Sequence, residues 1–194
     1  DSANETNVKA PGSPELDAHT RRLVEKSIAR VNGLVGEAGG KYDDIADLLG
    51  EMAPADQERM LGVMDVDDAE VIRRLLSYEE GTAGGLMTPE VIILGPDATV
   101  AEALAQVRDP DWVVSIATQI FVTQAPYKAP TGKLVGVVHM QRLLREPPNM
   151  GIGRLVADDP TVTPDATDRD VAEILASYDL LAVAVTDEAG RLLG

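Results

Sequence analysis

Carboxylates are the side chains whose type and spacing most clearly allow chemistry in this sequence. Asp65, Asp67 and Asp68 fall within four positions, and Glu79 and Glu80 follow about one helix length later. Such hard oxygen ligands suit Mg²⁺, which gives up its waters reluctantly and is often held by one or two carboxylates. We therefore treat Asp65, Asp67, Asp68, Glu79 and Glu80 as candidate metal ligands.

A structural role competes with this interpretation. Asp67 stands where a helix N-cap is expected, and Glu70 three residues later completes the pattern of a capping box. Taken singly, each acid is more often a cap or a solubilising group than a ligand. The hypothesis therefore concerns the acids as a group.

The search for catalytic chemistry is negative. The sequence has no cysteine, and His19 and His139 stand alone without a second metal-binding or nucleophilic partner at a known spacing. Gly151-Ile152-Gly153 lacks the strand-to-helix context of a dinucleotide-binding motif. We predict that the protein is not an enzyme.

Composition narrows the class of partner. The formal net charge of −16 opposes binding to nucleic acid through phosphate neutralisation and favours cations as ligands. Aromatic residues make up only 3%, so a core must rest on aliphatic packing. The sequence contains no apolar run near the ~20 residues that span a bilayer and no signal-peptide pattern at its start. We expect a soluble, cytoplasmic protein.

The elements that position the first acids are short helices. Residues 1–14 are polar with prolines and predict a loose lead-in, and apolar residues recur at helical spacing over 16–35. Further short helices are expected from Asp43, from Pro54 and from Asp67. Because such helices are unstable alone, residues 15–80 predict a helical bundle or superhelix.

The second half contains an imperfect internal repeat, with residues 81–150 as the first copy and 151–194 as the second. Pro96-Asp97-Ala98-Thr99 returns as Pro164-Asp165-Ala166-Thr167, and Gly132-Lys133-Leu134-Val135-Gly136 returns as Gly190-Arg191-Leu192-Leu193-Gly194. Each copy reads strand, helix, strand, turn, strand, helix, except that the second stops at Gly194 before its last helix. Two such small copies should pack together as one module.

The two halves meet in the run Tyr78-Glu79-Glu80-Gly81-Thr82-Ala83-Gly84-Gly85-Leu86-Met87-Thr88-Pro89-Glu90. Its glycines end a helix, and Thr88 before Pro89 favours extended backbone. The run closely resembles the linker of MgtE-type magnesium transporters, and the repeats resemble a pair of CBS domains. The resemblance covers about Asp43 to Gly194 and implies an α plus α/β fold, in which a helical superhelix or bundle precedes a tandem CBS pair.

Several expectations come from this resemblance alone. It implies a cytosolic region in which Mg²⁺ bridges acidic interfaces to favour a closed state, a homodimer formed through the CBS domains, and a transmembrane pore domain if the chain is part of a longer one. In that case the chain lies at the cytoplasmic face of the inner membrane. By position, Asp179 matches an acid that the family uses in the second CBS domain, and it joins the candidate metal ligands.

A nucleotide is the alternative ligand. Many CBS domains bind an adenine nucleotide with a hydroxyl and an aspartate near the last strand, but here His139 and Arg142 stand at those positions of the first copy. The runner-up function is therefore a stand-alone CBS module that binds an adenine nucleotide or a protein partner. A third possibility, an acidic helical adaptor, predicts no response to any ligand.

Overall fold

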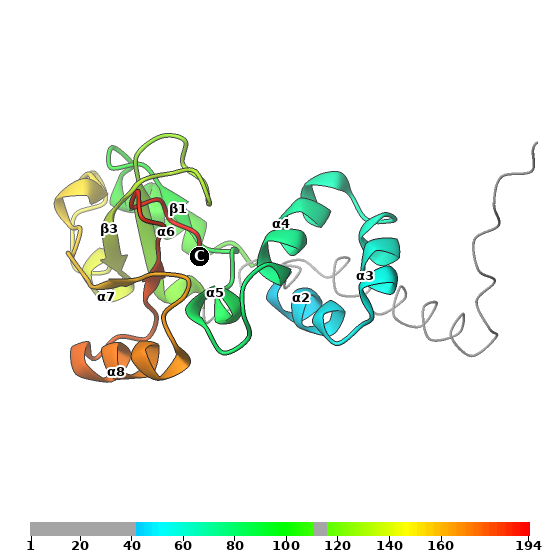
Figure 1. Cartoon of the computed structure of the whole chain (residues 1–194). Coiled ribbons are helices and arrows are strands. Elements are labelled where there is room, and N and C mark those ends of the chain that lie inside the picture. Colours follow the sequence, from blue (N-terminus) through cyan, green and yellow to red (C-terminus); the bar gives the residue numbers. More distant parts are fainter. Residues whose placement is uncertain (1–41, 111–115) are drawn as a thin grey trace, which may run out of the picture.

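The computed structural model describes residues 42–110 and 116–194. The expected lead-in over 1–14 and helix over 16–35 lie outside these residues. Figure 1 shows helices α2, α3 and α4 grouped at one end, a mixed helix and strand part at the other, and the short helix α5 between them. We call the first group the helical part and the second the repeat pair.

The three helices of the helical part begin within one residue of their predicted starts. Its helices are α2 (Tyr42–Gly50), α3 (Pro54–Leu61) and α4 (Val66–Leu76). Pro54 occupies the first turn of α3, where its missing N–H costs nothing. Helices α2 and α4 pack against each other through buried aliphatic side chains that include Ile45, Leu49 and Ile72.

The cap of α4 differs from the prediction. Asp65 is the N-cap, and its side chain accepts a hydrogen bond from the N–H of Asp67 at 3.0 Å. The helix starts at Val66, one residue before the predicted start. Asp65 precedes the helix and has extended backbone, whereas Asp67 already lies inside the first turn, so the expectation that Asp67 is the cap was wrong.

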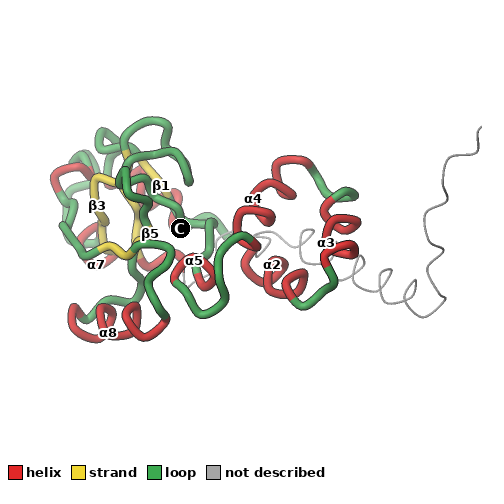
Figure 2. Tube along the Cα trace, in the orientation of Figure 1, coloured by secondary structure: helices red, strands yellow, loops and turns green. Residues whose placement is uncertain are grey.

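The repeat pair follows α5 (Ala83–Leu86), and Figure 2 shows its strands on the side away from α2 to α4. The first repeat contains β1 (Ile93–Leu94), α6 (Val100–Val107), a 3₁₀ turn (Ile116–Thr118), β2 (Gln119–Thr123), β3 (Leu134–His139) and α7 (Met140–Leu143). The second contains a 3₁₀ turn (Ile152–Arg154), β4 (Thr161–Val162), α8 (Asp168–Tyr178) and β5 (Ala184–Val185).

Strand register confirms the internal repeat. In the first sheet, β1 pairs parallel with β2 so that Leu94 lies opposite Val122, and Val122 in turn lies opposite Gly136 of antiparallel β3. In the second, Val162 of β4 lies opposite Val185 of β5, whose N–H donates to the carbonyl oxygen of Gly194 at 2.9 Å. Leu94 and Val162 are thus equivalent positions.

The two repeats form one module, as predicted. The N–H of Leu134 donates to the carbonyl of Gly190, the N–H of Leu192 donates to the carbonyl of Gly132, and both bonds measure 2.9 Å. These residues belong to the repeated segments 132–136 and 190–194. The two segments therefore form reciprocal hydrogen bonds, which relates them by an approximate twofold axis. Beneath them lies a shared buried cluster of Phe121, Val137, Ala184 and Leu192.

One apolar cluster links the helical part to the second repeat. It runs from Ile45 and Leu75 through Ala83 and Met87 of the junction to Val162, Val185 and Leu193. The first repeat has a separate cluster around Ile92, Ile120 and Leu143. Within residues 42–110 and 116–194, no helix is both long enough and apolar enough to cross a membrane.

Candidate functional site

The junction between the helical part and the repeat pair is held by backbone hydrogen bonds to the second repeat. The N–H of Ala83 donates to the carbonyl of Ala166 and the N–H of Gly84 to that of Pro164, both at 2.8 Å. In return, the N–H of Asp168 donates to the carbonyl of Gly81 at 2.9 Å. Residues 81–84 are therefore fixed on the loop that leads into α8.

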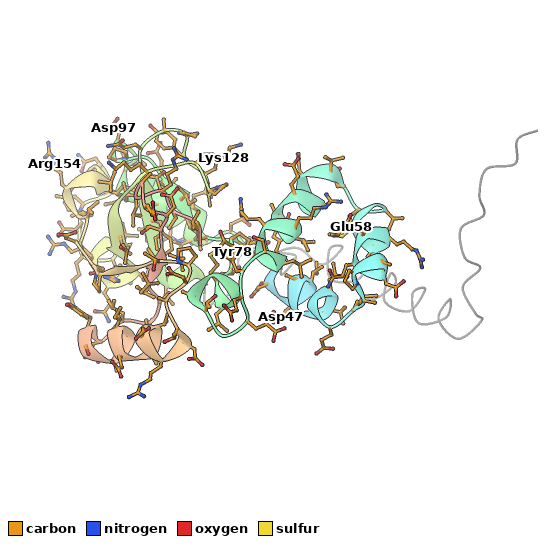
Figure 3. All side chains as sticks on the ribbon, viewed as in Figure 1. Asp47, Glu58, Tyr78, Asp97, Lys128 and Arg154 are labelled. Atoms are coloured by element: carbon orange, nitrogen blue, oxygen red, sulfur yellow. The ribbon has the colours of Figure 1, made fainter. Side chains whose placement is uncertain are left out.

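The glycine pair of the junction allows close packing against the end of the helical part. A Cβ atom on Gly84 would lie 2.6 Å from the ring of Tyr78, and one on Gly85 would lie 2.7 Å from the carbonyl oxygen of Glu79. Figure 3 labels Tyr78 between the helical part and the repeat pair, with Asp47 on the neighbouring helix α2. The glycines thus fix where α2, Tyr78 and α5 meet.

Acidic side chains border a cavity of about 180 Å³ at this meeting point. Asp43 and Asp47 of α2 and Glu80 at the start of the junction are among its lining residues. Gln57 and Tyr78 also line its wall. The cavity is large enough for a cation that keeps part of its water shell, which is the form in which carboxylates commonly hold Mg²⁺.

A second group of acids surrounds Tyr42 at the start of α2. The Tyr42 hydroxyl donates to Oδ1 of Asp68 at 2.6 Å, and its backbone N–H donates to the carboxyl group of Glu90. Burial is the main cause that raises the pKa of Glu90 to about 7; the Tyr42 N–H opposes this rise, and the charges of Asp43 and Asp68 add to it. Burial, followed by the Asp68 hydrogen bond, raises the pKa of Tyr42 well above its usual range.

The predicted ligands on the helical side are not gathered at one point. Asp65, Asp67 and Asp68 lie at the start of α4, while Glu79 and Glu80 follow its end, about 16 Å away along an eleven-residue helix. Among the described residues, no three Asp, Glu or His side chains are arranged to hold a bare metal ion. Only Glu80 of this predicted set lines the acidic cavity.

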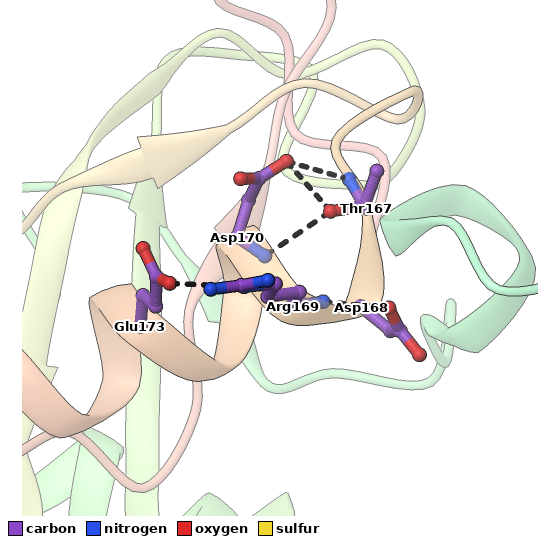
Figure 4. Close-up of polar contacts among 5 residues, drawn as sticks. All are labelled: Thr167, Asp168, Arg169, Asp170 and Glu173. Atoms are coloured by element: carbon purple, nitrogen blue, oxygen red, sulfur yellow. Dashed lines mark hydrogen bonds and ion pairs between the residues drawn. The ribbon is translucent and has the colours of Figure 1, made fainter.

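Asp179, the predicted ligand of the second repeat, lies at the opposite end of α8 from the junction loop. That helix begins with a capping box in which Thr167 and Asp170 exchange hydrogen bonds, with Arg169 and Glu173 paired on its surface (Figure 4). Asp179 ends the helix in the left-handed conformation with φ of 57°. It is exposed, so its carboxylate faces solvent.

Sequence reasoning missed Asp43, Asp47 and Glu90. Asp43 and Asp47 read as ordinary residues of a short helix, and Glu90 reads as the last residue of the junction motif. A local signal for the cavity does exist, because Asp43 and Asp47 are four residues apart and so share one face of α2. No local signal connects Glu90 with Tyr42.

In the first repeat, the two positions that depart from the nucleotide pattern are both engaged by acids. Nε2 of His139 lies 2.8 Å from Oδ2 of Asp159, which belongs to the segment entering the second repeat. Arg142 pairs with Glu146 at 2.9 Å within the same turn of chain. His139, which stands where nucleotide-binding CBS domains have a hydroxyl, thus makes a contact that links the two repeats.

A different, apolar cavity of about 290 Å³ lies between the junction, β2 of the first repeat and the second repeat. Leu86, Val171, Leu175 and Val183 are among its lining residues. Gln119 also lines it, is only 4% exposed, and has a side-chain nitrogen without a hydrogen-bond partner. A small, mostly apolar ligand with one hydrogen-bond acceptor suits this lining.

Known families match both parts of the chain. The MgtE intracellular N domain matches residues 41–81, and the CBS domain matches residues 83–149 and 152–194. These are regulatory domains of transporters rather than enzymes. The chain is 32% identical over 158 residues to the magnesium transporter MgtE of Thermus thermophilus, covering 78% of this chain and 34% of that protein.

Other relatives point the same way. MgtE of Enterococcus faecalis is 29% identical over 140 residues, covering 66% of this chain and 27% of that protein. The chain therefore spans about a third of the length of these curated relatives.

Solved structures agree with the fold. A crystal structure of the cytosolic domain of the Mg²⁺ channel MgtE in complex with ATP shares 31% identity at a TM-score of 0.69, covering 79% of this chain and 62% of that one. The soluble part of a magnesium transporter shares 26% identity at a TM-score of 0.76, covering 93% and 69%. The helical part followed by a CBS pair is thus the architecture of both.

Proposed function

Because the chain belongs to the MgtE family, with an MgtE N domain before a CBS pair, we propose that it is the magnesium-sensing cytosolic region of such a transporter or of a soluble relative. The acid-lined cavity at the junction carries this proposal. Asp43 and Asp47 of α2 and Glu80 of the junction all line it.

The chemistry follows from charge. Carboxylates a few ångströms apart near a protein surface repel by about 1–4 kcal/mol per pair, so the acidic faces oppose a compact arrangement. Asp47 and Glu80 would hold a hydrated cation between α2 and the junction and thereby offset the repulsion. Because the helical part shares its apolar cluster with the second repeat, a change at the junction would be transmitted to the CBS pair.

The chain's partners and location follow as parts of the same proposal. We expect a homodimer formed through the CBS domains, in which ions bridge acidic faces at high magnesium and favour the closed state. If the chain is part of a longer transporter, the movement of the helical part would gate a pore, and the region would lie at the cytoplasmic face of the inner membrane. Asp65, Asp67, Asp68, Glu79 and Asp179 remain proposed contributors to the acidic faces.

Thermal unfolding in the presence of Mg²⁺ tests the proposal. At about ten times its dissociation constant, Mg²⁺ should stabilise the folded chain by about 1.4 kcal/mol and raise the melting midpoint by a few degrees above a potassium chloride control of equal ionic strength. The pair Asp47→Asn and Glu80→Gln should remove most of this shift. Asp179→Asn should reduce it without backbone strain, since Asn also tolerates the left-handed conformation.

The matched control neutralises acids far from the junction. Asp97 and Glu188 are exposed turn residues of the repeat pair, so Asp97→Asn with Glu188→Gln changes the net charge equally. An equal loss of the magnesium shift in both pairs would mean general screening and would contradict a junction site. Small-angle scattering should also show a smaller radius of gyration with Mg²⁺ than with the salt control.

An adenine nucleotide is the second candidate ligand. The similar structure of an MgtE cytosolic domain in complex with ATP supports it, and the contact between His139 and Asp159 opposes it in the first repeat. The same melting experiment with a nucleotide separates the two functions. A midpoint shift with nucleotide and none with Mg²⁺ would favour a stand-alone CBS regulatory module.

A further inference from the structure

Gln119 is a polar side chain at the wall of the 290 Å³ apolar cavity. It is the first residue of β2, and alternate side chains of a strand point to the same face of a sheet. Gln119 therefore shares a face with Phe121, which belongs to the buried cluster between the two repeats. Ile120 and Val122 point the other way, into the core of the first repeat. The amide of Gln119 is thus directed away from that core.

This amide is a hydrogen-bond donor that the chain leaves unused. Gln119 is only 4% exposed, and its side-chain nitrogen finds no hydrogen-bond partner within residues 42–110 and 116–194. A buried donor costs free energy until it meets an acceptor, and most such groups in folded proteins have one. An acceptor supplied by a bound molecule would remove this cost.

The cavity joins three parts of the molecule. Its walls include Leu86 of α5, the side chains of β2, and Val171 and Leu175 of α8. Helices α5 and α8 contact each other, and Figure 1 shows them as neighbours. Val171 and Leu175 are four residues apart and so share one face of α8, a helix without a fully buried residue. The described residues therefore leave this apolar face only partly covered.

The lining also restricts the charge of a ligand. Thr88, Thr118 and Gln119 are the polar side chains among the described lining residues, and none of these residues is charged. A phosphate or carboxylate would enter without a cation to pair with it, and the net charge of −16 would repel it. Leu86 and Leu181 line the cavity although they are 60% and 82% exposed, so a bound apolar molecule would remove their surface from water.

We propose that this cavity binds an uncharged, mostly apolar small molecule that accepts one hydrogen bond from the Gln119 amide. An aromatic or aliphatic ketone has this chemistry, whereas a nucleotide does not. The ligand contacts the junction, β2 and the second repeat together, so its binding stabilises their arrangement. The site shares only Met87 with the acid-lined cavity, and it needs no metal ion.

Two probes of similar shape test the proposal. Acetophenone and ethylbenzene both carry an aromatic ring and a short chain, but only acetophenone has an acceptor oxygen. Each is titrated into the chain in a chelator, and the Leu and Val methyl signals are followed by NMR. Signals of Leu86, Val171 and Leu175 should move, while those of Val100 and Leu143 in the core of the first repeat should not. Acetophenone should bind roughly threefold to tenfold more tightly, as expected for one hydrogen bond.

Substitutions separate the donor from the apolar walls. Gln119→Leu removes the donor at similar volume, so both probes should bind with affinities within about twofold of each other. Gln124→Leu is the matched control, because Gln124 is an exposed glutamine directly after β2, and it should keep the preference for acetophenone. Leu175→Phe puts a larger side chain into the cavity and should weaken the binding of both probes by about tenfold. Unmoved signals of Val100 and Leu143 would show that each variant is folded.

Benzoate and adenosine monophosphate test the exclusion of charge. Neither should move the cavity signals at concentrations where acetophenone saturates them. Displacement of acetophenone by the nucleotide would make the cavity a nucleotide site and overturn the proposal. Equal affinity of the unaltered chain for the two neutral probes, no binding of either, or shifts spread over both repeats would overturn it as well. Because no divalent cation is present, these results do not depend on whether the chain binds magnesium.

Discussion

The two CBS repeats share their strand register but differ in how closely helices cover their strands. Leu94 and Val122 pair in the first repeat as Val162 and Val185 do in the second. Their helices also start alike, each with a capping box, at Thr99 in α6 and at Thr167 in α8. Local structure therefore follows the repeated residues closely.

Burial does not follow the repeat. Helix α6 buries Val100 and Ala103, whereas α8 has no buried residue. In the first repeat, Leu143 of α7 closes the apolar layer and is fully buried, while the second repeat borders the 290 Å³ cavity. Turns and helix caps therefore follow from the local residues, whereas a buried core also requires a further element that packs over it.

The largest expected effect tests this difference in burial. Leu143→Ala should lower the free energy of unfolding by about 2–5 kcal/mol, because it removes a fully buried side chain and leaves a cavity. Leu175→Ala, in the second repeat, should cost about 1 kcal/mol or less, because this side chain already borders a cavity. Urea denaturation followed by circular dichroism measures both.

Similar losses for the two leucines would break the comparison. They would mean that the second repeat is as well packed as the first and that the cavity closes in solution. Leu→Met at each site is the control for chemistry without a large volume change, and it should cost less than about 1.5 kcal/mol at either site.

A smaller effect separates the two capping boxes. Thr99→Ala and Thr167→Ala each remove a helix cap worth about 1 kcal/mol. Because α6 packs into the core of the first repeat, we expect the first change to lower global stability. Because α8 is not buried, the second should appear mainly as fraying of its first turn, measured by exchange of the Asp170 N–H.

Thr→Ser substitutions keep the hydroxyl and provide the matched controls. They should restore the stability lost at Thr99 and the protection lost at Thr167. If Thr167→Ala lowered global stability as much as Thr99→Ala, then α8 would be part of the cooperative core despite its exposure.

The sequence predicted most of the elements because their signals are local. The helix expected early in each repeat is confirmed, and it begins directly after the returning Pro-Asp-Ala-Thr motif, as α6 at Val100 and as α8 at Asp168. In the apolar run from Leu181 to Val185, only Ala184 and Val185 form a strand. Its apolar residues favoured a longer strand, but the strand partner β4 has only two residues.

The site was harder to predict because its contacts are long-range. Two neighbouring aspartates, Asp65 and Asp67, both fit a cap, and only the backbone geometry selects Asp65. The meeting of Glu90 with Tyr42 depends on how α5 turns the chain, which no periodicity encodes. The predicted grouping of acids remains a prediction for the assembled protein, since the described residues show no three acids or histidines arranged to hold a bare ion.

The last expected effect is in the pH dependence, and it contrasts the junction with both repeats. Hydrogen bonds from Thr99 and Thr167 lower the pKa values of Glu102 and Asp170, so the stabilisation from these caps is present above the ordinary carboxyl range and is lost as pH falls through the lowered values.

Burial raises the pKa of Glu90 from 4.5 to about 7, so the closed junction binds this proton more tightly than the open one. The contribution of Glu90 to closure is therefore greatest below about pH 4.5, declines as pH rises to about 7, and is constant above that. Melting midpoints from about pH 2 to about pH 8 should show that Glu90→Gln removes the decline below about pH 7, while Glu102→Gln and Asp170→Asn alter only the acid limb. The acid limb of the melting curve should be similar for both repeats, although only α6 has buried residues. Each cap acid is fully exposed, so its pKa depends on its hydrogen bonds to its own threonine and not on the core.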